Sequence, residues 1–130
     1  MIYLSYKQSW IPTEILEKEL NYIKNQINKL WEKIFIYYFD SNSNLPPKQL
    51  LKNFLLNIKK SNIVLAYINY PNKSEWQLLE LGMAYCLWKK IKILINKEVK
   101  ENYYLVYGLW EVIEFKNLEE VDFKKLIKQN

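Results

Sequence analysis

One glutamate in the second half of the chain stands alone in an apolar segment. From Leu78 to Trp88 the sequence reads Leu-Leu-Glu-Leu-Gly-Met-Ala-Tyr-Cys-Leu-Trp, and Glu80 is its one charged residue. A helix that is apolar nearly all round is buried, and a buried carboxylate is costly unless it is paired or protonated. The positions three and four residues away carry no charge. The pattern therefore predicts a functional carboxylate, and the alternative is a glutamate at the helix edge that reaches solvent.

The same segment carries a capping signal and a glycine. Ser74 followed by Gln77 matches a capping box, which predicts that the helix starts at Ser74 and runs to Trp88. Gly82 lies inside this helix, where glycine is about 1 kcal/mol less favourable than alanine. A helix glycine marks a close approach, either by a ligand or by a neighbouring backbone, which here is the first strand or a second subunit.

Several polar residues are expected near Glu80. Tyr3, Ser5, Lys7 and Ser9 belong to the first strand and its loop, and a hydrogen bond from Tyr3 would keep the Glu80 carboxylate ionised and nucleophilic. The alternative for Tyr3 is an ordinary strand aromatic without a functional role. The alternative for Lys7 is a surface lysine that binds no ligand. Asn69 and Tyr70 follow a buried strand. Asp40 and Asn42 follow another, where turn chemistry is the competing interpretation.

Trp76 is the best candidate for stacking on a ligand, because it lies in the first turn of the Glu80 helix. The other tryptophans, Trp10, Trp31, Trp88 and Trp110, are expected in the core or at an interface. The residues expected to bind substrate are Ser5, Lys7, Asp40, Asn69, Ser74, Trp76 and Gln77, with Glu80 and Tyr3 as the catalytic pair.

Strands and helices alternate along the chain. Strands are predicted over 2–5, 34–39, 62–68, 91–95 and 111–115. Helices are predicted over 16–30, 47–58, 74–88 and 119–128; residues 99–107 are ambiguous, a short helix being one option, and Gly108 is expected to break the chain. Strands that are apolar on both faces indicate a parallel sheet covered on both sides. We expect a single domain over residues 1–130 with an α/β, flavodoxin-like, doubly wound fold and strand order 2-1-3-4-5. Its ligand would bind beyond the carboxyl ends of the first and third strands.

Composition excludes several classes of protein. The 130 residues contain one cysteine and no histidine, which excludes a disulfide framework, a cysteine-based metal cluster and enzymes that depend on histidine. The 19 basic residues are all lysine and are spread along the chain, and arginine, the usual reader of guanine, is absent. No apolar run reaches the ~18 residues of a membrane span, and the N-terminus lacks a signal-peptide pattern. We expect a cytoplasmic protein that binds neither nucleic acid nor membrane.

Three segments resemble the nucleoside 2-deoxyribosyltransferase family and its deoxynucleoside-monophosphate glycosidase relatives. They are the start Ile2-Tyr-Leu-Ser-Tyr-Lys, the strand Ile63-Val-Leu-Ala-Tyr-Ile, and Asn72-Lys-Ser-Glu followed by Glu80-Leu-Gly-Met-Ala. The resemblance implies that Glu80 is the nucleophile, that Tyr3 supports it and that Ser74 helps to hold the sugar. This chain departs from the family in having Trp76 in place of a frequent glycine and Asn62 in place of an aspartate. It also lacks the phosphate loop of the nucleotide hydrolases.

A weaker resemblance leads to a related chemistry. Ser74-x-Trp76-x-x-x-Glu80 is similar to a helix of Toll/interleukin-1-receptor (TIR) domains, whose glutamate takes part in NAD cleavage in the enzymatic members. Both resemblances imply cleavage of an N-glycosidic bond at Glu80. A non-catalytic flavodoxin-like binding or assembly module is the third alternative.

We therefore expect a retaining N-glycosidase or transglycosidase that acts on 2-deoxyribonucleosides or their monophosphates. The expected mechanism needs no metal or cofactor. Apolar helix faces and the family pattern predict a homodimer or a larger homo-oligomer.

Overall fold

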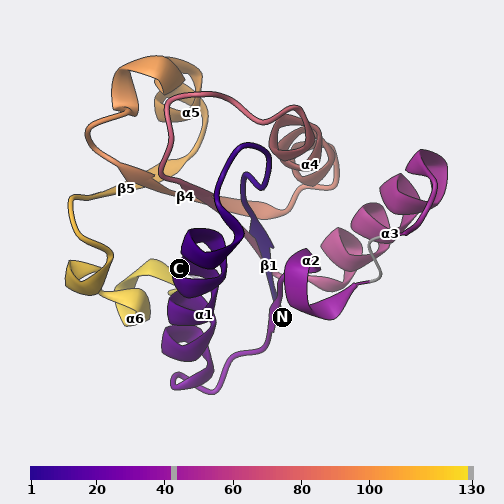
Figure 1. The fold of residues 1–130 in the computed structure, drawn as a ribbon, viewed down its shortest axis with the longest axis horizontal. Helices are drawn as coiled ribbons and strands as arrows, with labels where there is room; N and C mark the ends of the chain where they lie inside the picture. The colour runs from indigo at the N-terminus through magenta and orange to yellow at the C-terminus, as the bar shows by residue number, and fades with distance from the viewer. Residues whose placement is uncertain (42–43, 129–130) are drawn as a thin grey trace.

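Five parallel strands form the centre of the molecule (Figure 1). The structure, a computed structural model, describes residues 1–41 and 44–128. The strands are β1 (Ile2–Ser5), β2 (Ile34–Phe35), β3 (Ile63–Ile68), β4 (Lys90–Asn96) and β5 (Glu111–Phe115). Their order is β2-β1-β3-β4-β5, so the predicted doubly wound topology is confirmed. The direction of winding changes between β1 and β3, where Ser5, the last residue of β1, pairs with Ala66 of β3.

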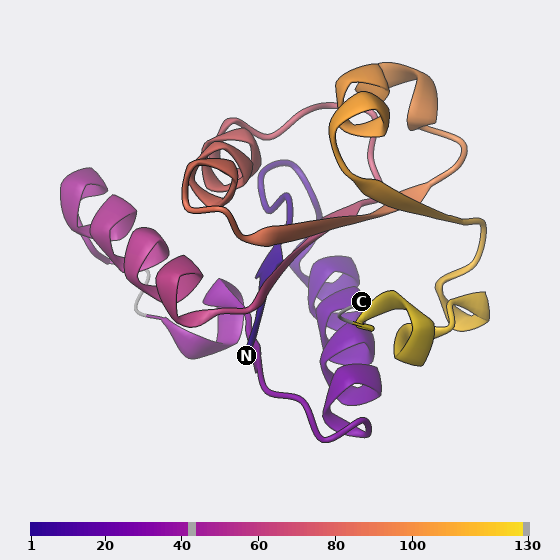
Figure 2. The same ribbon diagram turned by 180° about the vertical axis from the view of Figure 1, so that it is seen from behind.

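Helices cover both faces of this sheet (Figure 1 and Figure 2). Helices α1 (Thr13–Asn28) and α6 (Phe123–Leu126) pack on one face, whereas α3 (Pro47–Lys60), α4 (Glu75–Cys86) and α5 (Tyr104–Leu109) pack on the other. The short helix α2 (Tyr37–Asp40) follows β2, and 3₁₀ turns occupy Lys100–Tyr103 and Leu118–Glu120. Among the described residues, no helix combines the length and the apolar character that crossing a bilayer requires.

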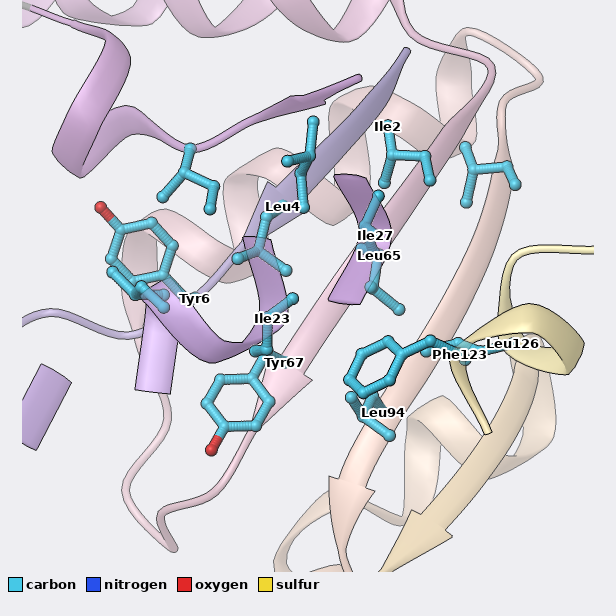
Figure 3. Close-up of a cluster of buried hydrophobic side chains, with 14 of the residues drawn as sticks. Ile2, Leu4, Tyr6, Ile23, Ile27, Leu65, Tyr67, Leu94, Phe123 and Leu126 are labelled. Atoms are coloured by element: carbon cyan, nitrogen blue, oxygen red, sulfur yellow. The ribbon is translucent and has the colours of Figure 1, made fainter. Parts of the chain in front are cut away.

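Each face of the sheet has its own apolar core, because successive strand residues point to opposite sides. Figure 3 shows the core beneath α1 and α6, a cluster that includes Ile2 and Leu4 of β1, Ile23 of α1 and Phe123 of α6. The other core joins Tyr3, Val64 and Ala66 to Leu81 and Ala84 of α4. Tyr3 therefore faces α4, which is the side that carries Glu80.

A buried lysine fastens the C-terminal segment to the sheet. Lys92 of β4 is 1% exposed, and its ammonium group donates a hydrogen bond of 2.6 Å to the backbone carbonyl of Leu126 and another to that of Lys128. Glu111 of β5 lies 3.8 Å from the same nitrogen. These acceptors compensate for the loss of hydration of the charged group.

Two predicted elements are too long, and one predicted break in the chain is wrong. The strand predicted over 34–39 ends at Phe35, because the Asp40 carboxylate accepts the N–H of Ile36 at 2.9 Å and fixes the helical turn of α2. Gly108 does not interrupt the chain but lies within α5. The helix predicted over 119–128 is reduced to α6, because Asp122 accepts the N–H of Lys125 at 3.1 Å and starts the helix there.

Three of the tryptophans expected in the core or at an interface are exposed in this chain and so lie outside the core. Trp10, Trp31 and Trp88 are 94–96% exposed and have positive φ angles of 68°, 64° and 57°. Two of them follow the ends of α1 and α4, at the left-handed position that usually carries glycine. Only Trp110 of this group is partly buried against the core.

Candidate active site

Glu80 is buried at the centre of a hydrogen-bonded group on α4. Its side chain is 5% exposed, and both of its carboxylate oxygens accept bonds from hydroxyl groups of β1. The Tyr3 hydroxyl donates to Oε2, and the Ser5 hydroxyl donates to Oε1 at 2.9 Å. Tyr3 and Ser5 are two residues apart on one strand, so their side chains point to the same face. The predicted contact between Tyr3 and Glu80 is therefore confirmed.

The electrostatics of this group are dominated by burial. Burial raises the pKa of Glu80 to about 7, and the hydrogen bonds from Tyr3 and Ser5 oppose that rise without cancelling it. Burial also raises the pKa of Tyr3 far above its ordinary value, and the charge of Glu80 adds to the effect. Tyr3 consequently remains a protonated donor, whereas Glu80 exchanges its proton near neutral pH.

Gln77 holds the helix start against the strand ends. Its side-chain amide donates hydrogen bonds of 3.1 Å to the backbone carbonyls of Ser5 and Tyr67, and its side chain is 3% exposed. Ser74 caps the helix by accepting the Gln77 N–H at 3.3 Å, so the predicted start of the helix is confirmed. The second half of the capping box is absent, because the Gln77 side chain reaches the strands instead of Ser74. Gln77 positions α4, and it does not line the pocket described next.

A pocket of about 480 Å³ opens beside Glu80. Its lining comes from the loop after β1, from α2 and α3, and from the first two turns of α4: Tyr6, Gln8, Ser9, Tyr37, Leu50, Phe54, Ser74, Trp76 and Glu80. A volume of this size accommodates a small organic ligand, and such sites combine apolar walls with a few polar groups. The pocket lies at the predicted edge of the sheet, where the strand order reverses.

Three aromatic rings form one wall of the pocket. The rings of Tyr37 and Phe54 meet edge to face with centroids 5.2 Å apart, and those of Phe54 and Trp76 meet in the same way at 5.3 Å. Phe54 is buried, whereas Trp76 is 38% exposed. Because these rings come from α2, α3 and α4, the wall exists only in the assembled fold. It offers an apolar surface to a planar ligand.

Five of the seven predicted binding residues are not among the lining residues: Ser5 and Gln77, whose hydrogen bonds are given above, and Asn69, Asp40 and Lys7. Asn69 lies two residues after Tyr67 and therefore shares its face of the sheet, towards α1. Its amide donates to Glu19 of α1 at 3.5 Å, and its amide oxygen accepts a bond of 2.8 Å from Asn96. Asp40 accepts the Ile36 N–H, as turn chemistry suggested. Lys7 is half-buried in the loop after β1 and is not among the lining residues. Asn42 lies outside the described residues.

The sequence interpretation missed five of the lining residues. They are Tyr6, Gln8, Tyr37, Leu50 and Phe54. Leu50 and Phe54 are four residues apart on α3, so the apolar stripe of that helix was the available signal, although it did not show what the stripe contacts. Within residues 1–41 and 44–128, no group of three histidine, cysteine, aspartate or glutamate side chains is arranged to hold a metal ion.

The fold and the site define a doubly wound α/β protein with a buried, hydroxyl-bonded glutamate at its switch point. Solved structures with the same fold agree with the family resemblance. A CMP N-glycosidase from Clostridium botulinum, BcmB, superposes with a TM-score of 0.70 at 23% identity, over 92% of this chain and 91% of that one. A 2-deoxyribosyltransferase from Bacillus psychrosaccharolyticus superposes with a TM-score of 0.62 at 19% identity, over 96% and 94%. No family model and no curated protein matches the sequence.

Proposed function

We propose that the protein cleaves or transfers N-glycosidic bonds of nucleosides or nucleoside monophosphates, with Glu80 as the nucleophile. The observation that carries this proposal is the Glu80 carboxylate, which is buried, held by Tyr3 and Ser5, and placed at the wall of a ligand-sized pocket. A carboxylate with a pKa of about 7 is ionised in part of the molecules at neutral pH. The activities named for the two structural neighbours support the same reaction class.

The chemistry follows from the position of the carboxylate. In the first step, one Glu80 oxygen bonds to the anomeric carbon, and the base departs with the electron pair of the C–N bond and is protonated from solvent. In the second step, water or another base attacks the same carbon and releases Glu80. Two displacements at one carbon retain its configuration. A deoxy sugar favours the reaction, because no 2-hydroxyl withdraws electrons from the developing cation.

Burial of Glu80 contributes to the first step. The raised pKa shows that the fold holds the ionised carboxylate at a cost in free energy. Forming the sugar ester removes the negative charge, so that cost is relieved as the bond forms. Tyr3 and Ser5 keep the two oxygens oriented and remain hydrogen-bond donors throughout.

The remaining lining residues suggest how the substrate is oriented. The exposed ring of Trp76, supported by Phe54, provides a stacking surface for the base. The Ser74 hydroxyl faces the same pocket and is placed to hold a sugar hydroxyl or a phosphate oxygen. We expect 2-deoxyribonucleosides or their monophosphates as substrates, with CMP as a further compound to test.

Chromatography of released bases tests this function. Wild type, Glu80→Gln and Glu19→Gln are each incubated with deoxyinosine plus adenine, with mixed deoxynucleoside monophosphates, with CMP and with NAD. Glu19 is the matched control, because its carboxylate accepts bonds from Tyr67 at 2.6 Å and Tyr70 at 2.8 Å on the opposite side of the sheet. We expect base release or deoxyadenosine formation by wild type and Glu19→Gln, and none by Glu80→Gln.

The other outcomes would redirect the assignment. Full activity of Glu80→Gln would refute the nucleophile. Nicotinamide release from NAD alone would support the TIR-like alternative, and inactivity on all substrates would support a binding module. Retention is checked with methanol as acceptor, because nuclear magnetic resonance then shows the configuration of the methyl glycoside.

A further inference from the structure

A second cleft, here called the α1 cleft, lies on the face of the sheet opposite Glu80. It has a volume of about 720 Å³, and its lining comes from α1, from the carboxyl ends of β3, β4 and β5, and from residues 116–119. The chain after β5 forms only a 3₁₀ turn and the one-turn helix α6, which lies beside α1 (Figure 1). Because the long helix predicted over 119–128 is absent, less of the sheet is covered next to α1, and the α1 cleft occupies the remaining space.

Asparagine is concentrated in the α1 cleft. Five of the 14 asparagines of the chain line it, and they come from four separate segments: Asn21, Asn25, Asn69, Asn96 and Asn117. The lining of the pocket beside Glu80 includes no asparagine. A side-chain amide carries a hydrogen-bond donor and an acceptor side by side. The α1 cleft therefore suits a ligand whose edge also alternates donors and acceptors.

Two of these amides are fixed by the chain, and two are open to a ligand. The Asn96 side chain donates to Oδ1 of Asn69 at 2.8 Å and accepts the N–H of Glu98 at 2.9 Å, so both amides have a defined orientation. Asn21 and Asn25 are exposed on α1, and their side chains make no hydrogen bond to the part of the chain that the structure describes. They are four residues apart, so they share one face of the helix.

Aromatic rings complete the lining of the α1 cleft. The rings of Tyr67 and Phe115 are buried and stack with centroids 5.9 Å apart at an angle of 17°. Tyr22 of α1 is half-buried and adds a third ring. Glu19 belongs to the supporting frame, because its two oxygens already accept bonds from Tyr67 and Tyr70. Rings beside unbound amides favour a planar ligand that is polar at its edge.

The charges of the α1 cleft favour a neutral ligand. Two lysines line it, but so do two glutamates, so an anion such as phosphate gains no net attraction there. Nucleobases are neutral and planar, and asparagine pairs with adenine through its donor and its acceptor together. We propose that the α1 cleft binds a nucleobase, free or within a nucleoside, through the amides of Asn21 and Asn25. This site is separate from the Glu80 pocket, and the proposal does not depend on the reaction at Glu80.

Nuclear magnetic resonance titration of isotope-labelled Glu80→Gln tests this site, because this variant should leave a nucleoside uncleaved. Adenine and deoxyadenosine are added separately, and the side-chain amide signals of Asn21 and Asn25 should shift and saturate. Asn25→Ala and Asn28→Ala in the same background are the matched pair, because both asparagines are exposed on α1 but Asn28 does not line the cleft. Followed at Asn21, the dissociation constant should rise roughly 3- to 10-fold in Asn25→Ala and stay unchanged in Asn28→Ala.

Two further ligands show what the α1 cleft recognises. Deoxyribose alone should shift no signal there, and deoxyadenosine monophosphate should bind there no more tightly than deoxyadenosine. Saturable binding of deoxyribose, or a preference for the monophosphate, would indicate a sugar or anion site and overturn the proposal. Shifts confined to the pocket beside Glu80 would also overturn it and would leave the proposed function intact. Equal effects of Asn25→Ala and Asn28→Ala would contradict the proposed contact with Asn25.

Discussion

Removing the Tyr3 hydroxyl tests how the site controls the charge of Glu80. In Tyr3→Phe the ring remains, and with it the stacking on Phe35 at a centroid distance of 5.4 Å. The change therefore removes one hydrogen bond to the carboxylate and leaves the bond from Ser5. A hydrogen bond to a charged group contributes about 1.5–3 kcal/mol, which corresponds to a change of about 1 to 2 in pKa.

The direction of the effect follows from which form the bond stabilises. The Tyr3 bond favours the ionised carboxylate, so its loss should raise the pKa of Glu80 from about 7 towards 8 or 9. At pH 7 the ionised fraction would fall from about one half to about 1–10%, and the rate would fall about 5- to 50-fold. At pH 9 most of the activity should return, within about two-fold of wild type.

The assay is the pH dependence of kcat/KM for base release, which reports the pKa of the free enzyme. Tyr67→Phe is the matched control, because Tyr67 is also buried and donates to Glu19 at 2.6 Å on the opposite face of the sheet. The acidic limb of the pH profile of Tyr67→Phe should coincide with that of wild type. An unmoved acidic limb in Tyr3→Phe, or a loss equal at every pH, would refute the reasoning.

Three more predictions concern Glu80 and two tryptophans. The Glu80 carboxyl titrates near 4.5 when unfolded and near 7 when folded, so the fold binds the extra proton between these values and loses stability as pH rises. Glu80→Gln should therefore gain about 2–3 kcal/mol relative to wild type between pH 5 and pH 8 in urea unfolding; a gain independent of pH would contradict this. Trp76→Ala should raise KM about tenfold with a smaller effect on kcat, since base stacking contributes about 1–3 kcal/mol; an unchanged KM would remove Trp76 from the base site. Trp88→Gly should stabilise the fold by about 1 kcal/mol, because Trp88 is 94% exposed at a φ of 57°; urea unfolding checks this, and destabilisation would show that the exposed ring makes a contact.

The strand order could be predicted because the sheet is built from local patterns. Each strand is a short β-rich run bounded by loops, and each long helix has one apolar stripe. The aromatic run after Ile34 was misassigned, since its residues favour strands in general. The chain instead turns into α2, where the ring of Tyr37 packs against Phe54 and the Asp40 carboxylate accepts the N–H of Ile36.

The parts of the site that follow from the pattern within a single helix or strand could be predicted. Glu80 was found as an isolated charge, and Tyr3 and Ser5 share a strand face that points at it. Strand alternation would also have placed Asn69 on the α1 side, where Glu19 and Asn96 lie. The aromatic wall could not be predicted, because it depends on how three helices approach one another.

Helix α4 shows why an apolar segment with one charge and one glycine is informative. Its inner face needs apolar residues to pack on β1 and β3, and Glu80 is retained there at a cost in stability. Its outer face has no such requirement within one chain, yet Leu78, Leu79 and Tyr85 are exposed there beside Gly82. The two exceptions to good helix design lie on opposite faces, so one cause cannot explain both. The proposed nucleophile accounts for Glu80 on the inner face, whereas Gly82 on the outer face needs an explanation of its own.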